Sequence, residues 1–264
     1  MACMQEDAIA RQFVLTPAAG KRLIAKGICE HPAVKAALDS GTVVVVAGTT
    51  NGTVAEELLK ALGQDEDFDR SRFFRGVTLP PASEVTDSGR LPDESQFPGD
   101  VVITSGKWQQ GKTIFDALDD LKEGDVILKG ANALDPIQER AAILIGHPRA
   151  GTVGAALQVM AGRRVRLILP VGVEKRIPGD LDELAAAINR PGAQGARLLP
   201  VPGEVFTELH AVRMLTGAEA DLIAAGGVGG AEGCVWIGLS GHGEEVTAAE
   251  ELLHSVANEP PFRV

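Results

Sequence analysis

The chain has 264 residues, of which 45% are hydrophobic, and a formal net charge of −11; this length allows a sizeable core in one large domain or two unequal ones. The acidic balance and the few aromatic residues, 8 Phe and 2 Trp without any Tyr, argue against a nucleic-acid partner. No apolar stretch approaches the roughly 20 residues of a membrane helix, and three widely spaced cysteines fit neither a disulfide framework nor a metal site, so we expect a cytoplasmic protein without a membrane partner.

The first predicted elements are two helices. Thr16 followed by Pro17 is typical of a helix N-cap and first helical position, and residues 18–26 continue that helix. A second helix is predicted over residues 32–38 and should end before Gly41, because glycine is a common stop signal.

Residues 41–62, GTVVVVAGTTNGTVAEELLKAL, are the most informative segment. Four consecutive valines are typical of a strand buried on both faces of a parallel sheet, and the apolar residues that follow the loop recur at helical spacing. The polar loop between them therefore lies at a strand's carboxyl end and begins a helix, a position suited to a phosphate or carboxylate. The candidate anion-binding residues are Gly48, Thr49, Thr50, Asn51, Gly52 and Thr53. The alternative is an ordinary turn with Asn51 or Thr53 as the N-cap.

Strands and helices then alternate to the end of the chain. A strand over residues 72–79 precedes residues 80–99, a polar, proline-containing segment that is long for a plain connection and is expected to form a flap. Further strands are predicted at residues 100–104, 125–128, 142–145, 165–170, 196–201, 221–225 and 234–239. The clearest helices are predicted at residues 152–160, 181–188, 205–215 and 246–256.

Two glycine-rich motifs resemble nucleotide-binding sequences. Residues 106–113, GKWQQGKT, satisfy the phosphate-loop pattern G-x-x-x-x-G-K-[ST], but Trp and two Gln are large for such a loop, and no apolar strand ending in Asp is evident to hold Mg²⁺. A β-hairpin that turns at Ser105-Gly106 accounts for the same residues. Residues 226–233, GGVGGAEG, lead into another apolar strand and not into the helix that a dinucleotide site requires, so we expect a tight turn there.

Candidate catalytic groups lie in residues 125–139, DVILKGANALDPIQE. A short apolar strand ends at Lys129, which either extends to solvent or neutralises an anion in a cleft. A carboxylate of Asp135 or Glu139 could move a proton on a carbon next to a carbonyl, while Lys129 stabilises the developing enediolate oxygen. Asp135-Pro136 is equally typical of a helix N-cap with Pro at the first helical position.

Together these patterns resemble the superfamily of ribose-phosphate isomerases, glucosamine-phosphate isomerases and CoA transferases. The resemblance is topological, covers residues 41–178, and is carried by GTTNGTVAEELL, LKGANALD, GHPRAGT and LILPVGVEKRIP. It implies that residues 48–53 bind phosphate or another anion, that Lys129 is the electrostatic partner, and that Asp135 or Glu139 is the base. Further candidate substrate-binding residues are Gly130, Asn132 and Lys175. Arg149, which flanks a glycine loop before the helix predicted from residue 152, is either a second anion-binding residue or an ordinary surface arginine.

The chain also departs from the isomerase pattern. Their acidic D-G-A-D motif has no clear counterpart before Lys129, and their lysine turn has glycines where this chain has Ala131 and Asn132. Gly172 replaces an acid in the later strand, and Glu174-Lys175 follows it.

CoA transferases of the same superfamily form an acyl-enzyme on a glutamate, which offers a second interpretation. Glu204 and Glu208, in PGEVFTELH, stand four apart on one face of a predicted helix and are the alternative nucleophiles, with CoA as the cofactor. Acids in a first helical turn are also common without any function, because they interact favourably with the helix dipole. A third interpretation is a metabolite sensor that lacks catalysis.

The sequence therefore predicts an α/β protein with a mostly parallel sheet and helices on both faces. Residues 1–191 would form the main domain, and residues 192–264 a smaller C-terminal αβ portion packed on the same sheet or continuous with it. The predicted function is to bind, and to isomerise by proton transfer, a small phosphorylated or carboxylated metabolite. No cofactor is expected for that reaction. The five histidines lack ligand spacing, so no metal site is indicated, and we expect a homo-oligomer.

Overall fold

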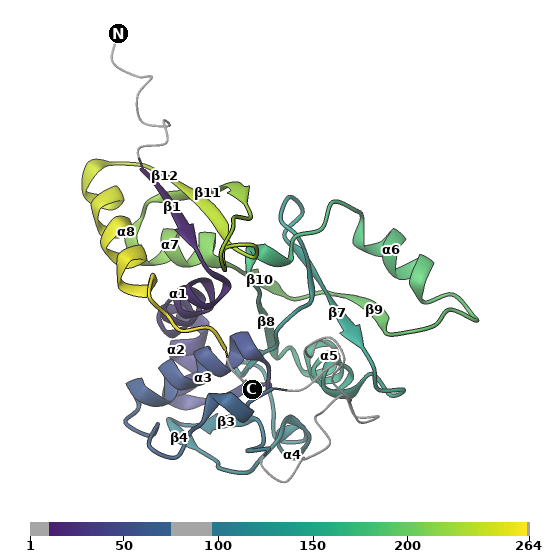
Figure 1. Cartoon of the computed structure of the whole chain (residues 1–264). Coiled ribbons are helices and arrows are strands. Elements are labelled where there is room, and N and C mark those ends of the chain that lie inside the picture. Colours follow the sequence, from purple (N-terminus) through teal and green to yellow (C-terminus); the bar gives the residue numbers. More distant parts are fainter. Residues whose placement is uncertain (1–10, 75–96, 263–264) are drawn as a thin grey trace.

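A computed structural model describes residues 11–74 and 97–262 (Figure 1). The chain forms an α/β fold with three sheets. Its helices are α1 (Pro17–Glu30), α2 (Pro32–Ser40), α3 (Thr49–Ala61), α4 (Ile114–Ala117), α5 (Gly151–Arg163), α6 (Leu181–Ile188), α7 (Glu208–Thr216) and α8 (Gly243–Val256), with short 3-10 helices η1 (Arg70–Arg72) and η2 (Val173–Lys175). Its strands are β1 (Arg11–Leu15), β2 (Thr42–Val45), β3 (Val101–Thr104), β4 (Lys107–Trp108), β5 (Val126–Leu128), β6 (Ala133–Asp135), β7 (Arg140–Ile145), β8 (Arg166–Pro170), β9 (Arg197–Val201), β10 (Glu204–Phe206), β11 (Glu219–Ala225) and β12 (Val235–Ser240).

The largest sheet has six strands in the order β10-β8-β5-β2-β3-β4. The first four strands are parallel to one another, whereas β3 and β4 add an antiparallel edge. Three of the four valines lie in β2, and all four are buried, as predicted, because α2 and α3 contact this strand and β3 and β5 pair with it on either side. The carboxyl ends of four parallel strands therefore meet at one edge of this sheet.

Buried polar side chains hold the strand ends in place. Asp100 is fully buried, and its two carboxylate oxygens accept hydrogen bonds from Ala47 N (2.9 Å) and Ile114 N (2.8 Å). Asp125 accepts in the same way from Thr42 N (2.7 Å) and Lys122 N (2.8 Å). Each carboxylate satisfies two backbone donors that would otherwise lack partners, which fixes the loops around the sheet.

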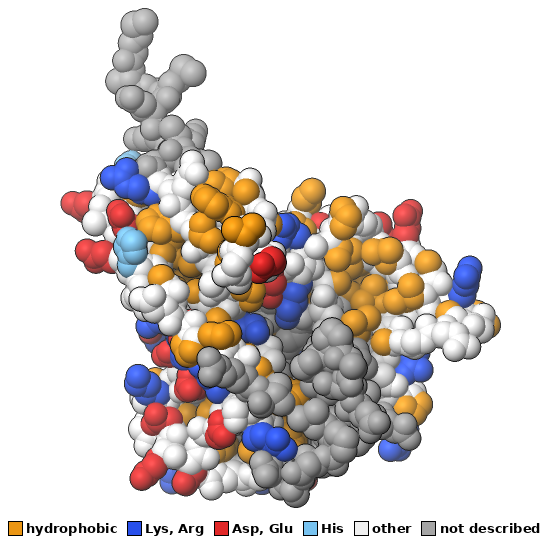
Figure 2. Space-filling model, in the orientation of Figure 1, with side chains coloured by type: hydrophobic (Ala, Val, Ile, Leu, Met, Phe, Trp, Pro, Cys, Tyr) orange, Lys and Arg blue, Asp and Glu red, His pale blue; other side chains and the backbone are white. Residues whose placement is uncertain are grey.

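Two three-stranded antiparallel sheets flank the large one. Sheet A has the order β1-β12-β11, and sheet C has the order β6-β7-β9. Val14 and Trp236 face each other across β1 and β12 and are 42% and 38% exposed, and hydrophobic side chains gather over this sheet in Figure 2. Residues 192–262 contribute strands to all three sheets.

Both glycine-rich motifs form hairpins. Strands β3 and β4 pair around Ser105 and Gly106, which have positive φ angles of 47° and 72°, so the predicted turn is confirmed. The helix that follows, α4, has only four residues, which differs from the longer helix expected after a phosphate loop. Residues 226–233 connect the antiparallel strands β11 and β12, which confirms the second predicted turn.

Several predicted elements differ from the structure. Helix α3 begins at Thr49 with Gly48 as its N-cap, so neither Asn51 nor Thr53 caps it. The predicted helix over residues 205–215 begins at Glu208, because residues 204–206 form β10 beside β8. Residues 72–74 are not in a strand, and residues 75–79, like most of the expected flap, lie outside the described residues.

Asp135-Pro136 does not begin a helix. Asp135 ends β6, and the chain turns back into β7. Asp135 Oδ1 accepts hydrogen bonds from Ile137 N (2.9 Å) and Gln138 N (3.0 Å), which stabilise the turn. The same side-chain capping that favours Asp before a helix also favours it in a tight turn.

Candidate functional site

The candidate site is the edge of the large sheet where the parallel strands end. Four segments lie there in the order of their strands, one after each of β10, β8, β5 and β2. They begin with Thr207-Glu208, Val171 to Lys175, Lys129 to Ala131, and Ala47 to Thr49 respectively. Ligands of open parallel sheets bind at such an edge, and acidic and basic side chains gather on it here.

The predicted anion loop forms the first turn of α3. Asn51 is fully buried, and its side-chain amide donates to Val46 O (2.7 Å) and Leu128 O (2.9 Å), which ties the ends of β2 and β5 together. Among the residues that the structure describes, the buried atoms Asn51 Oδ1 and Thr50 Oγ1 have no hydrogen-bond partner. The turn therefore combines helix N–H groups with unsatisfied side-chain oxygens.

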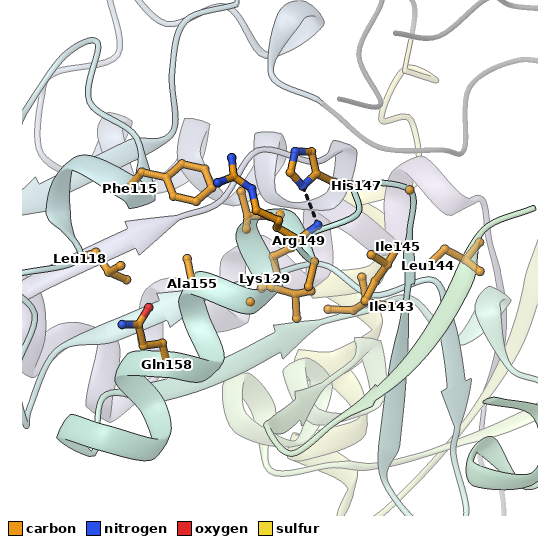
Figure 3. Close-up of a pocket in the computed structure, with 16 residues that line it drawn as sticks. Phe115, Leu118, Lys129, Ile143, Leu144, Ile145, His147, Arg149, Ala155 and Gln158 are labelled. Atoms are coloured by element: carbon orange, nitrogen blue, oxygen red, sulfur yellow. Dashed lines mark hydrogen bonds between the residues drawn. The ribbon is translucent and has the colours of Figure 1, made fainter. Parts of the chain in front are cut away.

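Lys129 and Arg149 line one cavity of about 720 Å³, as Figure 3 shows. Lys129 comes from the end of β5, and Arg149 from the loop before α5. His147 Nδ1 accepts a hydrogen bond from Arg149 N (3.1 Å), which shapes this loop. The remaining wall is largely apolar and includes Phe115, Leu118, Ile143, Leu144, Ile145 and Val153. This cavity, the α5 pocket, brings together two residues that the sequence analysis placed in one site.

A second group of charged side chains, the lysine cluster, consists of Lys21, Glu174, Lys175 and Glu208. Lys175 Nζ donates a hydrogen bond to Ala131 O (2.9 Å), which holds its ammonium group between the ends of β8 and β5. Lys21 projects from α1 and interacts electrostatically with the other three residues and with Arg70. Burial and the ammonium of Lys175 together lower the pKa of Lys21.

Glu208 is the most deeply buried acid of the cluster, with only 1% of its surface exposed. One carboxylate oxygen accepts a hydrogen bond from Val173 N (2.9 Å), and the side chain packs against Gly20 of α1. Burial and the negative charge of Glu174 raise the pKa of Glu208 to about 8, although the Val173 N–H opposes this shift. Burial beside Glu174 therefore favours the protonated form of Glu208.

Glu174 connects the cluster to a cavity of about 530 Å³. Its carboxylate folds back over Gly172, where any side chain would overlap it. Both Glu174 and Asp135 line this cavity, together with Arg176 and Ile177. The glycine that replaces an acid in the isomerase pattern thus makes room for the acid two residues later.

The other predicted residues have structural partners. Asn132 Oδ1 accepts a hydrogen bond from Leu144 N (2.9 Å) across the β6–β7 hairpin. Glu139 lies at the tip of that hairpin with a φ of 51° and contacts His210 Nε2 at 3.2 Å, with 67% of its side chain exposed. Gly130 is the exception, because a Cβ added to it would meet no atom of the described residues within 4 Å. The catalytic roles assigned to Asp135 and Glu139 stay predictions.

Glu204 and Glu208 do not share a helix face. Glu204 begins β10, so it lies at the opposite end of that strand from Glu208. Its carboxylate contacts His31 Nε2 (2.9 Å) and Arg166 Nη1 (3.2 Å). The hydrogen bond from His31, with help from Arg166, lowers the pKa of Glu204. The oxygens of this carboxylate are therefore already engaged by His31 and Arg166.

No protein-family model matches the sequence, and a search of curated proteins finds no similar sequence. Over the described ranges, 11–74 and 97–262, no helix is long and apolar enough to cross a membrane. Within the same ranges, no three His, Cys, Asp or Glu side chains are grouped so that they could hold a metal ion.

Sequence reasoning missed Lys21. The residue belongs to an ordinary amphipathic helix, where a lysine is usually a solvated surface residue. Only the packing of α1 against α7 and α3 brings it to the strand ends. The one local signal is Gly20 beside it, because a glycine inside a helix often marks a close contact.

Proposed function

We propose that the chain binds a small phosphorylated or carboxylated metabolite at the carboxyl ends of the parallel strands and transfers a proton at the carbon next to its carbonyl group. The observation that carries the proposal is the lysine cluster. In a chain of net charge −11, two lysine side chains and a buried acid with a raised pKa meet at the edge where such sheets bind ligands.

The residues divide the work by their chemistry. Lys175 and Lys129 attract the anionic group and stabilise negative charge that develops on the carbonyl oxygen. The first turn of α3, residues 49–51, adds N–H donors for the anion. Glu174, which faces a cavity, takes the proton, and Glu208 supplies one. Proton transfer is thus assigned to these two acids instead of Asp135, whose carboxylate already holds a turn.

We extend the proposal to the arrangement of the layers, the cellular location and the oligomeric state. We propose the three-layer arrangement of the isomerase and CoA-transferase superfamily, with helices on both faces of the large sheet. A cytoplasmic location and a homo-oligomer belong to the same proposal. Acyl transfer is less well supported, because Glu204 is ion-paired and Glu208 is buried away from a large substrate such as an acyl-CoA.

Deuterium exchange tests the proposed reaction. The protein would be incubated with pentose and hexose phosphates and with small carboxylates in deuterated buffer, and loss of the substrate C–H signal would be followed by NMR. We expect exchange that Glu174→Gln slows by about 10² to 10⁴, because the variant lacks the proton acceptor. Hydroxylamine trapping with acyl-CoA, run in parallel, reports acyl transfer, and saturable binding without either signal identifies a sensor.

A lysine pair provides the matched control. Lys175→Met should weaken anion binding in isothermal titration with phosphate and pentose phosphates, because it keeps the stem and removes the charge. Lys112→Met removes an exposed lysine of the apparent phosphate loop and should leave binding unchanged. Equal binding by both variants would contradict the proposed site, and ATP hydrolysis lost with Lys112 would favour the phosphate loop.

A further inference from the structure

Lys21 occupies a place where an ammonium ion is poorly accommodated. Its predecessor, Gly20, is buried, and a methyl group added there would come within 3.2 Å of Glu208 Cδ, so α1 lies directly on that acid. Lys21 is half-buried, and no hydrogen bond or ion pair of its ammonium group is seen among the residues that the structure describes. It therefore lacks the partner that a buried charge normally needs.

The charges around Lys21 come from three elements besides α1. Lys175 and Glu174 belong to η2, Arg70 to η1, and Glu208 to α7. Lys175 is held in place by Ala131 O, so its positive charge cannot easily move away from Lys21. Burial and this second ammonium favour the neutral amine of Lys21, which is the nucleophilic form.

We propose that Lys21 is a nucleophile that forms an imine with the carbonyl group of a small anionic carbonyl compound. The inference rests on the proposed function for its substrate class, and it replaces the enediolate with an enamine. Three features carry it: an amine without a hydrogen-bond partner among the described residues, a fixed neighbouring cation that disfavours its protonation and attracts the substrate's anion, and two acids within the same cluster.

The step balances within the cluster. The Lys21 Nζ lone pair attacks the carbonyl carbon, the C–N bond forms, and the carbonyl oxygen takes the proton of Glu208. The nitrogen then loses one proton to the Glu174 carboxylate, which returns it to the hydroxyl group as the C–O bond breaks. Water leaves, and the products are a protonated imine and the Glu208 carboxylate. The Glu174 carboxylate then takes a proton from the carbon next to the imine carbon, which gives the neutral enamine and protonated Glu174, and no oxidant or reductant takes part.

Reductive trapping tests the inference. The full chain would be incubated with pyruvate or dihydroxyacetone phosphate and with sodium cyanoborohydride, then analysed by intact mass and peptide mapping. We expect a single adduct, with the mass of the carbonyl compound less one oxygen atom, on the peptide that contains Lys21. The adduct should be lost in Lys21→Arg, which keeps the charge, and retained in Lys26→Arg, which alters another half-buried lysine of α1. Circular dichroism establishes that both variants fold.

The pH profile adds a second readout. Lys175→Met removes the neighbouring charge, so half-maximal trapping at Lys21 should move to higher pH. Adducts spread over many lysines, trapping that survives Lys21→Arg, or no adduct while calorimetry shows anion binding would overturn the inference and leave the proposed function standing. Equal trapping of dihydroxyacetone and its phosphate would instead contradict the proposed anion site while leaving the nucleophile in place.

Discussion

The proton on Glu208 links the site to pH. Because its pKa is raised in the folded protein, the folded state holds this proton between the ordinary glutamate value and about pH 8, whereas the unfolded chain releases it. The stability that the group contributes is complete at low pH and is lost as the pH rises, with a slope of up to about 1.4 kcal/mol per pH unit. We expect Glu208→Gln to lose less stability between about pH 5 and pH 8 than the unsubstituted chain, as measured by urea unfolding. Parallel pH profiles would show that Glu208 is ionised at neutral pH.

Substitution of two helical glycines by alanine distinguishes the effect of helix propensity on stability from the effect of close packing. A Cβ added to Gly162 in α5 would meet no atom within 4 Å outside its own helix backbone, so Gly162→Ala should stabilise the chain by up to about 1 kcal/mol. Gly20→Ala would place a methyl group against the Glu208 carboxylate and should destabilise the chain instead. Thermal melts of the two variants give the comparison, and a stabilising Gly20→Ala would mean that Glu208 has room to move.

For single residues, the sequence indicated which side chains could act chemically, but it predicted only in part which of them lie together in the fold. Lys129 and Arg149 were predicted to bind the same anion, and they line one pocket because β5 and the loop before α5 end at the same edge. Asp135 was given a catalytic or a helix-capping role, yet its oxygens satisfy a turn. Lys21 gave no usable signal, because its environment comes from α7 and η2, which are distant in sequence.

At the scale of helices and strands, two aspartates that accept hydrogen bonds near α4 show how much burial adds to the stability that such bonds contribute. Asp100 is fully buried and accepts from Ala47 N and Ile114 N, whereas Asp116 is exposed and accepts from Thr113 N. Asp100→Asn leaves one buried N–H facing an amide donor and should cost about 1 to 3 kcal/mol in chemical denaturation. Asp116→Asn should cost clearly less, because water replaces the lost acceptor. Equal losses would show that the Asp100 contacts are weak.

The positions of helices and strands were predicted better than the pairing of strands into sheets. Apolar runs and helical spacing located β2, β3, β5, β8 and most helices, since those signals are local. The division into three sheets depends on pairings such as β7 with β9 and β1 with β12, which no local pattern reveals. Strand β10 was taken as helix because three residues carry too little periodicity, and its pairing with β8 decides the outcome.

At the scale of the whole molecule, Glu259 connects the segment after α8 to α1 and η1 through ion pairs. Its carboxylate accepts from Arg22 (2.9 Å) and Arg70 (2.8 Å), and Arg22 also pairs with Glu56 and Glu57 of α3. Burial opposes its ionisation, but the two guanidinium groups hold the pKa of Glu259 below its usual value. Its stabilising contribution is therefore present near neutral pH and is lost as the pH falls through the folded-state pKa.

Glu259→Gln should lower the thermal midpoint near pH 7 and change it little in strong acid. The difference between the variant and the unsubstituted chain should shrink with added salt, since part of the network is exposed. Glu250→Gln, which removes a more exposed partner of Arg11, is the control and should have a smaller effect. A salt-independent loss would instead indicate a packing defect.

The pairing of β1 with β12 also constrains how the chain is made. Arg11 lies opposite Leu239, so the first described strand meets its neighbour only after nearly all of the intervening chain has emerged from the ribosome. Until then Leu15, which is buried in the finished protein, has no partner strand. Sheet A therefore cannot form before β12 has been synthesised, and a nascent chain stalled before residue 235 should depend on chaperones that shield β1.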